Sequence, residues 1–452
     1  MPTETTQALA GFASSLTIDA MPDHVREAGK ILLLDALACG LAGHKGEETG
    51  QMYAMAAALG QSDENSIIGG GRLPLAGATL INGFLITAVT MCDTHRATLT
   101  HITPEVVPPA LAIAERDALS GSDLLVAIAA GCEVATRVGL GLNYPVFREK
   151  GWHGPGVIGP FGSAAAIGSL RGFDAETMAR AFGLAGSQSA GTFAAWGTPT
   201  VKFHQCRGAL SGLMAALLAE QDFVATKEFL TAPDGGLYNT YSDGGLPGLA
   251  TDDLGERWEL ERIALRLWPS ATHLQTMITA LFDIIEQRDV RFDEIEKIRI
   301  AMCETPYNMH GGFARYRAKF EALLSAHYVA AVVLRDRALT LAQFEPECYD
   351  DRKLRGFAAG RVEISHDPVL INGQVRVEID ISDGTSLSGL CDHPRGAPEN
   401  PVSRDDIEEK FRIYAPAQFD DARIDEIIGA VDRLEELESV NFLIKLLRTD
   451  SA

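Results

Sequence analysis

A histidine and a lysine, each framed by turn-forming residues, are the first candidates for chemistry in this sequence. His153 lies in Gly151-Trp152-His153-Gly154-Pro155-Gly156, and Lys202 lies in Thr198-Pro199-Thr200-Val201-Lys202. The segments beside them are rich in Ala, Gly and Ser, so the helices that they predict can pack closely. Polar groups at the ends of such helices can converge on one cavity. We therefore expect His153 and Lys202 to face one site, although both residue types are also common in exposed loops.

A second polar segment runs from Thr90 to His101, between two apolar helical patterns. It carries Asp93, Thr94 and His95 as well as His101. Such a segment is either a capped loop or the wall of a site, and the residues alone leave both interpretations open. His95, His204 and His310 are expected to be structural.

These residue types suit one kind of reaction. Removing a proton next to a carboxylate needs a base tuned near neutral pH and cations that stabilise the developing negative charge. A histidine with a lysine or arginine supplies both without a metal. Further groups of this kind occur far along the chain, and only the fold can bring them together: Arg207, His273 and Tyr307.

The composition excludes several classes of function. The formal charge of −22 argues against a nucleic-acid partner or an anionic membrane surface. The seven cysteines are odd in number and form no CxxC pair, so neither a disulfide framework nor a cysteine-based metal site is expected. No export signal or transmembrane stretch is predicted, which gives a cytoplasmic location as the expectation.

Common catalytic motifs are also missing from the sequence. Gly69-Gly70-Gly71 precedes no lysine at P-loop spacing, and Gly139-Leu140-Gly141 follows a helical pattern where a Rossmann motif would follow a strand. The sequence contains no G-x-S-x-G elbow and no H-E-x-x-H pair. Ordinary nucleotide-binding, hydrolase and metalloprotease functions are therefore not expected.

Hydrophobic periodicity divides the chain into two kinds of structure. Through the first 225 residues apolar positions recur every three or four residues, which predicts an all-helical domain. Beyond Glu259, runs of alternating residues predict strands around Ile263 to Leu267, Ile298 to Met302, Val362 to Ile364 and Val375 to Ile381. We expect a helical domain over 1–258, an α+β domain over 259–394, and C-terminal helices over 395–452 that pack back on the first domain. The fold class is mainly α.

Several short segments, taken in order, resemble the MmgE/PrpD superfamily, which includes 2-methylcitrate dehydratase, cis-aconitate decarboxylase and iminodisuccinate epimerase. They span nearly the whole chain: Leu34 to Gly43, Ile81-Asn82-Gly83, Val106 to Ala112, Gly151-Trp152-His153, Phe161 to Ala166, Lys202 with Arg207, Trp268-Pro269-Ser270, and Arg395 to Pro401. The chain is identified as a member of that superfamily on their order and spacing.

The resemblance implies a large helical domain with a smaller α+β lid, a homodimer, no metal or organic cofactor, and a cleft for a small carboxylate substrate. It implies that His153 is an acid or base and that Lys202 binds a carboxylate. The catalytic set is completed by Asp93, His101 and Tyr307. Thr94, Arg207 and His273 are expected to bind substrate; for Arg207, pairing at a helix start with a backbone carbonyl or a Glu is an equal alternative.

One departure bears on the reaction. Lyases of the family carry Asp-x-Asp-Asp before a Ser or Thr, whereas this chain reads Thr90-Met91-Cys92-Asp93-Thr94. The leading hypothesis is a cofactor-independent lyase, a dehydratase or decarboxylase, for a di- or tricarboxylate of the methylcitrate or aconitate type, acting by proton abstraction next to a carboxylate. The alternatives are an epimerase or isomerase with the same first step and a noncatalytic carboxylate binder.

Overall fold

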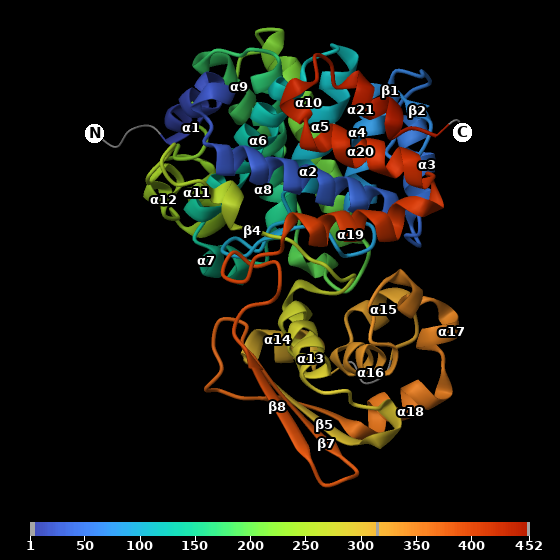
Figure 1. Cartoon of the computed structure of the whole chain (residues 1–452). Helices are drawn as coiled ribbons and strands as arrows, with labels where there is room; N and C mark the ends of the chain where they lie inside the picture. The colour runs from blue at the N-terminus through green and yellow to red at the C-terminus, as the bar shows by residue number, and fades with distance from the viewer. Residues whose placement is uncertain (1–4, 313–315, 450–452) are drawn as a thin grey trace. The chain divides into compact units, whose positions relative to one another are not determined.

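The computed structural model describes residues 5–312 and 316–449, which fold into two compact units (Figure 1). The helical unit comprises Met1–Ala264 together with Ser403–Ala452, and the α+β unit comprises Leu265–Val402. The chain thus leaves the helical unit once and returns to it.

The helical unit is built from fifteen α-helices in its described part and two short pairs of strands. The helices are α1 Thr5–Ser15, α2 Asp23–Gly43, α3 Thr49–Ala58, α4 Leu75–Thr87, α5 Thr103–Arg116, α6 Gly121–Gly141, α7 Tyr144–Glu149, α8 Gly154–Leu170, α9 Ala175–Gly186, α10 Thr200–Glu220, α11 Leu237–Ser242, α12 Pro247–Thr251, α19 Arg404–Tyr414, α20 Asp421–Asp432 and α21 Asn441–Leu446. The strand residues are β1 Asn65–Ser66 paired with β2 Arg72–Leu73, and β3 Thr94–His95 paired with β4 Ile263–Ala264.

Helix α8 lies at the centre of this unit and packs against α5, α6, α9 and α10. Its small residues allow this: a side chain at Gly162 would place its Cβ 2.8 Å from the carbonyl oxygen of Gly131 on α6. Helix α6 is long and apolar enough, by length and composition, to cross a membrane, but 94% of its most apolar window is buried inside the unit. That burial is typical of a core helix.

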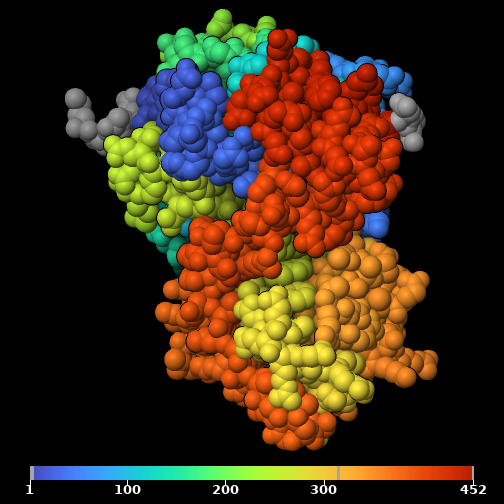
Figure 2. Space-filling view, viewed as in Figure 1, coloured from blue at the N-terminus to red at the C-terminus, as the bar shows by residue number. Residues whose placement is uncertain are grey.

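The C-terminal helices lie against the N-terminal ones, and Figure 2 shows the red C-terminal segment spread over the face of the helical unit beside the blue α2. Helix α19 packs on α2, where Lys410 Nζ lies 2.6 Å from Asp35 Oδ1. Both side chains are almost fully buried. Asp35 and Lys410 therefore form a buried ion pair that joins two helices far apart in sequence.

The α+β unit packs helices on a four-stranded sheet. The strands are β5 Ile295–Met302, β6 Val362–His366, β7 Val375–Ile381 and β8 Ser386–Cys391, in the order β6-β5-β7-β8, with β5 and β6 parallel and the other pairs antiparallel. The helices are α13 Gln275–Gln287, α14 Glu304–His310, α15 Lys319–Leu323, α16 Ala326–Asp336, α17 Pro346–Tyr349 and α18 Arg352–Arg361. Inward-facing residues of β5 and β7 share the core with α13 and α16.

A mainly α fold is confirmed, while several details differ from the sequence prediction. The strand expected around Ile263 to Leu267 is only Ile263–Ala264, and it pairs with β3 inside the helical unit. The units accordingly divide after Ala264 and after Val402, a few residues beyond the expected positions. The pairing with β3 is a long-range contact, which alternation in the sequence does not reveal.

Helices α8 and α10 begin several residues before the apolar runs that indicate them in the sequence. Helix α8 starts at Gly154, with Pro155 in its first turn and Pro160 inside it, and α10 starts at Thr200. Proline is well tolerated in a first helical turn, so Pro155 marks the start of α8. Lys202 and Arg207 consequently lie within α10. The helical segment that begins at Lys319 is interrupted between α15 and α16, where Ser325 caps the second helix.

The buried pair between α2 and α19 gives a test of how the C-terminal segment is held. Replacing only Lys410 with Met leaves the Asp35 carboxylate buried without its partner, which we expect to lower the free energy of unfolding by about 3–5 kcal/mol. The double variant Asp35→Leu, Lys410→Met should recover most of this loss. Denaturant unfolding followed by circular dichroism measures both. A single variant as stable as the native protein would contradict the assignment.

Candidate active site

The carboxylate of Asp93 caps the start of α5. Its two oxygens accept the backbone N–H groups of Ile102 and Thr103, at 2.8 and 3.0 Å, and the hydroxyl of Thr103. The side chain is fully buried, and burial raises its pKa while the bonds from Thr103 and Ile102 oppose that rise. Asp93 was predicted to contact substrate; in the structure its oxygens are used inside the fold.

The same loop orients His101. Its Nδ1 lies 2.7 Å from the backbone carbonyl oxygen of Asp93 and 3.2 Å from the hydroxyl of Thr94. Because a carbonyl can only accept, Nδ1 carries a proton, and in the neutral ring the lone pair is on Nε2. Thr94, predicted to bind substrate, thus lies against the His101 ring.

His153 lies at the N-cap position of α8, with its backbone N–H donated to the carbonyl of Gly191 at 3.1 Å. The Thr90 to His101 segment lies against the first turn of this helix, because a Cβ at Gly154 would collide with the Thr100 hydroxyl. The two polar segments singled out in the sequence therefore meet.

His153 is paired with His204 of α10. Their Nδ1 atoms are 2.9 Å apart, so one Nδ1 donates a proton to the other, and the accepting ring carries its own proton on Nε2. Burial, followed by repulsion from His204, His101 and Arg148, lowers the pKa of His153 to about 3. Burial also lowers the pKa of His204. At neutral pH both rings are uncharged. His204 was predicted to be structural, and Arg148 was not among the predicted site residues.

Lys202, in the first turn of α10, forms an ion pair with Glu48 at the N-cap of α3, with Nζ and Oε2 3.1 Å apart. The lysine side chain is 6% exposed and the glutamate side chain 21%. Lys202 and His204 are two residues apart on the helix, so they project from different sides of α10. Glu48 was not identified from the sequence.

In the described part of the chain, the guanidinium of Arg207 donates its hydrogen bonds to backbone carbonyls and to one hydroxyl. Nη1 donates to the carbonyl of Gln188 and the hydroxyl of Ser211, and Nη2 donates to the carbonyls of Gly156 and Ala190. The predicted carboxylate anchor therefore takes the alternative role, in which it binds backbone carbonyls. It fastens the start of α8 to the loop that ends at Gly191 and so positions His153.

Glu105 is a residue that the sequence did not reveal. It lies in the first turn of α5, is fully buried, and neither carboxyl oxygen has a hydrogen-bond partner in the described part of the chain. A Cβ at Gly159 of α8 would overlap this carboxyl, and one at Gly208 of α10 would lie 3.4 Å from it. Burial and then the charge of Asp93 raise its pKa well above the ordinary value, while Arg207 opposes the rise.

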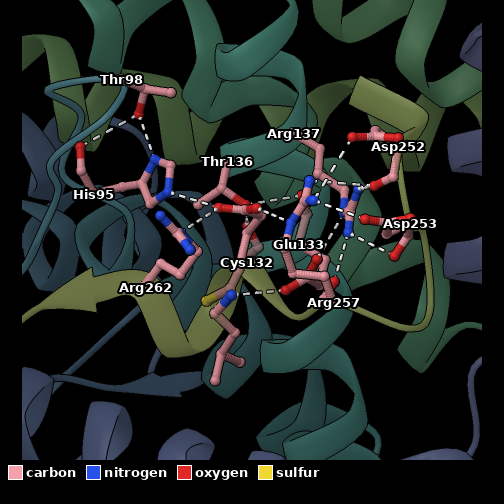
Figure 3. Close-up of polar contacts among 12 residues, drawn as sticks. His95, Thr98, Cys132, Glu133, Thr136, Arg137, Asp252, Asp253, Arg257 and Arg262 are labelled. Atoms are coloured by element: carbon pink, nitrogen blue, oxygen red, sulfur yellow. Dashed lines mark hydrogen bonds and ion pairs between the residues drawn. The ribbon is translucent and has the colours of Figure 1, made fainter. Parts of the chain in front are cut away.

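A buried ionic network contacts the Thr90 to His101 loop through His95 (Figure 3). His95 contacts Thr98 through Nδ1 at 2.9 Å and Glu259 through Nε2 at 3.2 Å. Burial would raise the pKa of Glu259, but hydrogen bonds from His95 and Arg257 hold it at about 2. Glu133 pairs with Arg137 at 2.8 Å and accepts the N–H of Leu260. The structural role expected for His95 agrees with this geometry.

The remaining predicted residues belong to the α+β unit, which is considered by itself. His273, just before α13, lies with its ring 5.9 Å from that of His310 on α14, and burial lowers its pKa to about 4. Tyr307, also on α14, stacks on His366 of β6 with ring centres 6.0 Å apart. Within this unit α14 therefore presents one ring toward His273 and another toward β6.

The imidazoles of His101 and His204 and the guanidinium of Arg148 lie close enough to His153 to act on its charge, and this group suits proton transfer near an anion. Lys202 projects from another side of α10. Among residues 5–312 and 316–449, no three His, Cys, Asp or Glu side chains are placed to hold one metal ion.

Two sequence profiles match the chain: the MmgE/PrpD N-terminal domain over residues 7–249 and the MmgE/PrpD C-terminal domain over residues 268–435. The chain is 28% identical to a cis-aconitate decarboxylase-like protein, oryM, of Aspergillus oryzae, with 98% of this chain and 97% of that protein covered. It is 27% identical to cis-aconitate decarboxylase of Aspergillus terreus, covering 98% and 95%. The human cis-aconitate decarboxylase is 28% identical, with 99% and 95% covered.

The buried acid Glu105 predicts a pH dependence of stability. With its pKa raised in the folded chain, the folded state keeps a proton that the unfolded state loses, so stability falls as pH rises above about 5. Glu105→Gln, which cannot ionise, should be free of this fall. As the pH rises, the free energy of unfolding of Glu105→Gln minus that of the native protein should increase by up to about 1.4 kcal/mol per pH unit. Urea unfolding between pH 5 and pH 8 measures the difference, and parallel profiles would contradict it.

Proposed function

This chain belongs to the MmgE/PrpD family, and from that premise we propose that it is a lyase of the dehydratase or decarboxylase type for a small polycarboxylate. The first substrate to test is an unsaturated tricarboxylate such as cis-aconitate, which the names of its relatives contain. The observation that carries the proposal is the neutral imidazole pair of His153 and His204, set beside His101.

The charges around the pair favour an anionic ligand. Burial lowers the pKa of His153 most, and among the described residues the charges that act on it are those of His204, His101 and Arg148, which are all positive when protonated. A bound polycarboxylate would supply the missing negative charge and raise the proton affinity of the ring. Substrate binding would therefore convert a weak base into one suited to neutral pH.

Decarboxylation in such a site consumes one proton. The bond between a carboxylate and the carbon next to a C=C breaks, and its electron pair forms a new double bond as CO₂ leaves. The electrons of the old double bond then take a proton on the carbon beside a remaining carboxylate. An imidazole protonated in the presence of the polyanion delivers it.

Dehydration would use the same groups in the opposite sense. One ring removes the proton beside a carboxylate, and a protonated group assists the departing hydroxide. When His153 donates through Nδ1, its Nε2 accepts a proton; when His204 donates, the Nε2 of His153 carries one. The paired rings can therefore act as an acid or as a base.

The reaction can be identified by proton NMR in deuterated water with a panel of di- and tricarboxylates. A lyase gives a new alkene, with CO₂ if carboxyl is lost. Deuterium uptake without either product would identify an epimerase instead. Tight binding of a polycarboxylate with no exchange and no product would leave the noncatalytic binder.

Replacing His153 tests the assignment of the acid and base. Removing a group that transfers a proton in the transition state should lower kcat about 10²- to 10⁴-fold in His153→Ala. His24→Ala, at an exposed position on α2, is the matched control and should keep native activity. Steady-state kinetics on the identified substrate measures both. Native turnover by His153→Ala would contradict the assignment of His153 as the acid or base.

The homodimer that the resemblance implies has a candidate surface on α10. Phe203, Met214 and Leu218 are exposed along one face of this helix, and Phe223 and Val224 follow it. If a second copy of the chain covered these apolar side chains, they would be removed from contact with water.

Light scattering should therefore give the mass of two chains, and Met214→Glu with Leu218→Glu should give the mass of one. Met55→Glu, an exposed methionine on α3, is the control and should leave the dimer intact. A native protein with the mass of one chain would contradict the proposal.

A further inference from the structure

Glu48 lies where a substrate carboxylate would have to bind if Lys202 is the anchor. The glutamate Oε2 is 3.1 Å from Nζ, which is the distance expected for an ammonium and a carboxylate in direct contact. The lysine is nearly buried, at 5% exposed, so its ammonium is reached through a small part of its surface. A second carboxylate that binds there meets the charge of Glu48.

The backbone holds Glu48 in this position. It is the N-cap residue of α3, and its carbonyl accepts the N–H of Met52. The next residue, Thr49, is buried and donates its hydroxyl to the carbonyl of Gly43 at 2.7 Å, which fixes the turn between α2 and α3. Moving the carboxylate away from Lys202 therefore requires a side-chain rotation, because the backbone is fastened.

From this placement we propose that Glu48 is a built-in competitor for the anchor lysine, which sets how strongly the site binds carboxylate ligands. The inference rests on the proposed function, because it takes the ligand to be a polycarboxylate and Lys202 to be the anchor that the family resemblance implies. If the ligand displaces Glu48, the ion pair is lost on binding. If the ammonium, with its three donors, holds both carboxylates, the two like charges repel each other. In both cases the charge of Glu48 weakens the binding of an anion.

The test measures binding without turnover. The probe is propane-1,2,3-tricarboxylate, a saturated tricarboxylate with no double bond to react, titrated into the full-length protein by calorimetry. Glu48→Gln keeps the size and polarity of the side chain and removes the charge. We expect its Kd to fall about 3- to 10-fold relative to the native protein, the effect of removing a partly exposed ion pair.

Glu47→Gln is the matched control, because Glu47 is the exposed neighbour and its replacement changes the net charge by the same amount. Its Kd should stay within about twofold of the native value, since exposed charges are screened by salt. Glu48→Ala, as a second variant, should also bind more tightly, and thermal melting shows whether each variant is folded.

Lys202→Met separates this inference from the proposed function. A Kd raised at least about tenfold in that variant, with tighter binding in Glu48→Gln, supports both. Weaker binding in Lys202→Met combined with unchanged or weaker binding in Glu48→Gln overturns the role of Glu48 alone. Unchanged binding in Lys202→Met overturns the lysine as anchor, and so does an absence of probe binding in all the proteins.

Discussion

The cap that Asp93 forms on α5 is the interaction on which the candidate site depends. Its carboxylate accepts the N–H groups at the start of the helix, and its own carbonyl accepts the Nδ1 proton of His101. One residue therefore fixes the direction of α5, the path of the loop before it, and the tautomer of a histidine. The acid that family resemblance assigned to the substrate acts here on the protein, and the ligand would meet the histidines that it orients.

Burial then decides the charge of the site. The His153 and His204 rings lie against each other, and in the described part of the chain no carboxylate acts on them to compensate a proton, so both stay neutral. Also on α10, the ammonium of Lys202 is paired with Glu48, and Arg207 is bound to four groups of the fold. A polyanion is the partner that such a surface lacks. Its binding would change the proton affinity of the rings and compete for the lysine at the same time.

Much of this could be predicted from the sequence, because local patterns determine it. Pro155 and the glycines beside it indicate a helix start directly after His153, and the polar run from Thr90 to His101 was recognised as the wall of a site or a capped loop. In the structure it is a capped loop, and its Thr100 lies against the first turn of α8 beside His153. The close approach of Gly154 to Thr100 joins the two segments, as their small residues allow.

The features that could not be predicted from the sequence are contacts between residues far apart in the chain. Glu48 precedes Lys202 by more than 150 positions, and no local pattern links them. Arg207 binds carbonyls whose positions depend on the path of the 188–190 loop. Glu105 reads in the sequence as an ordinary acid in a first helical turn, a favourable place near the helix dipole. Only the packing of α8 and α10 makes it a buried carboxyl without a partner.

The protonation state of His153 tests the central claim most directly. Nitrogen-15 NMR of histidine-labelled protein, with His153→Asn to assign the signals, reports the charge of each ring as the pH is lowered. We expect the His153 ring to stay neutral down to about pH 4 in the ligand-free protein, in line with a pKa of about 3. We also expect saturating propane-1,2,3-tricarboxylate to raise this pKa. A ring that titrates near pH 6.5, unchanged by the tricarboxylate, would contradict both expectations.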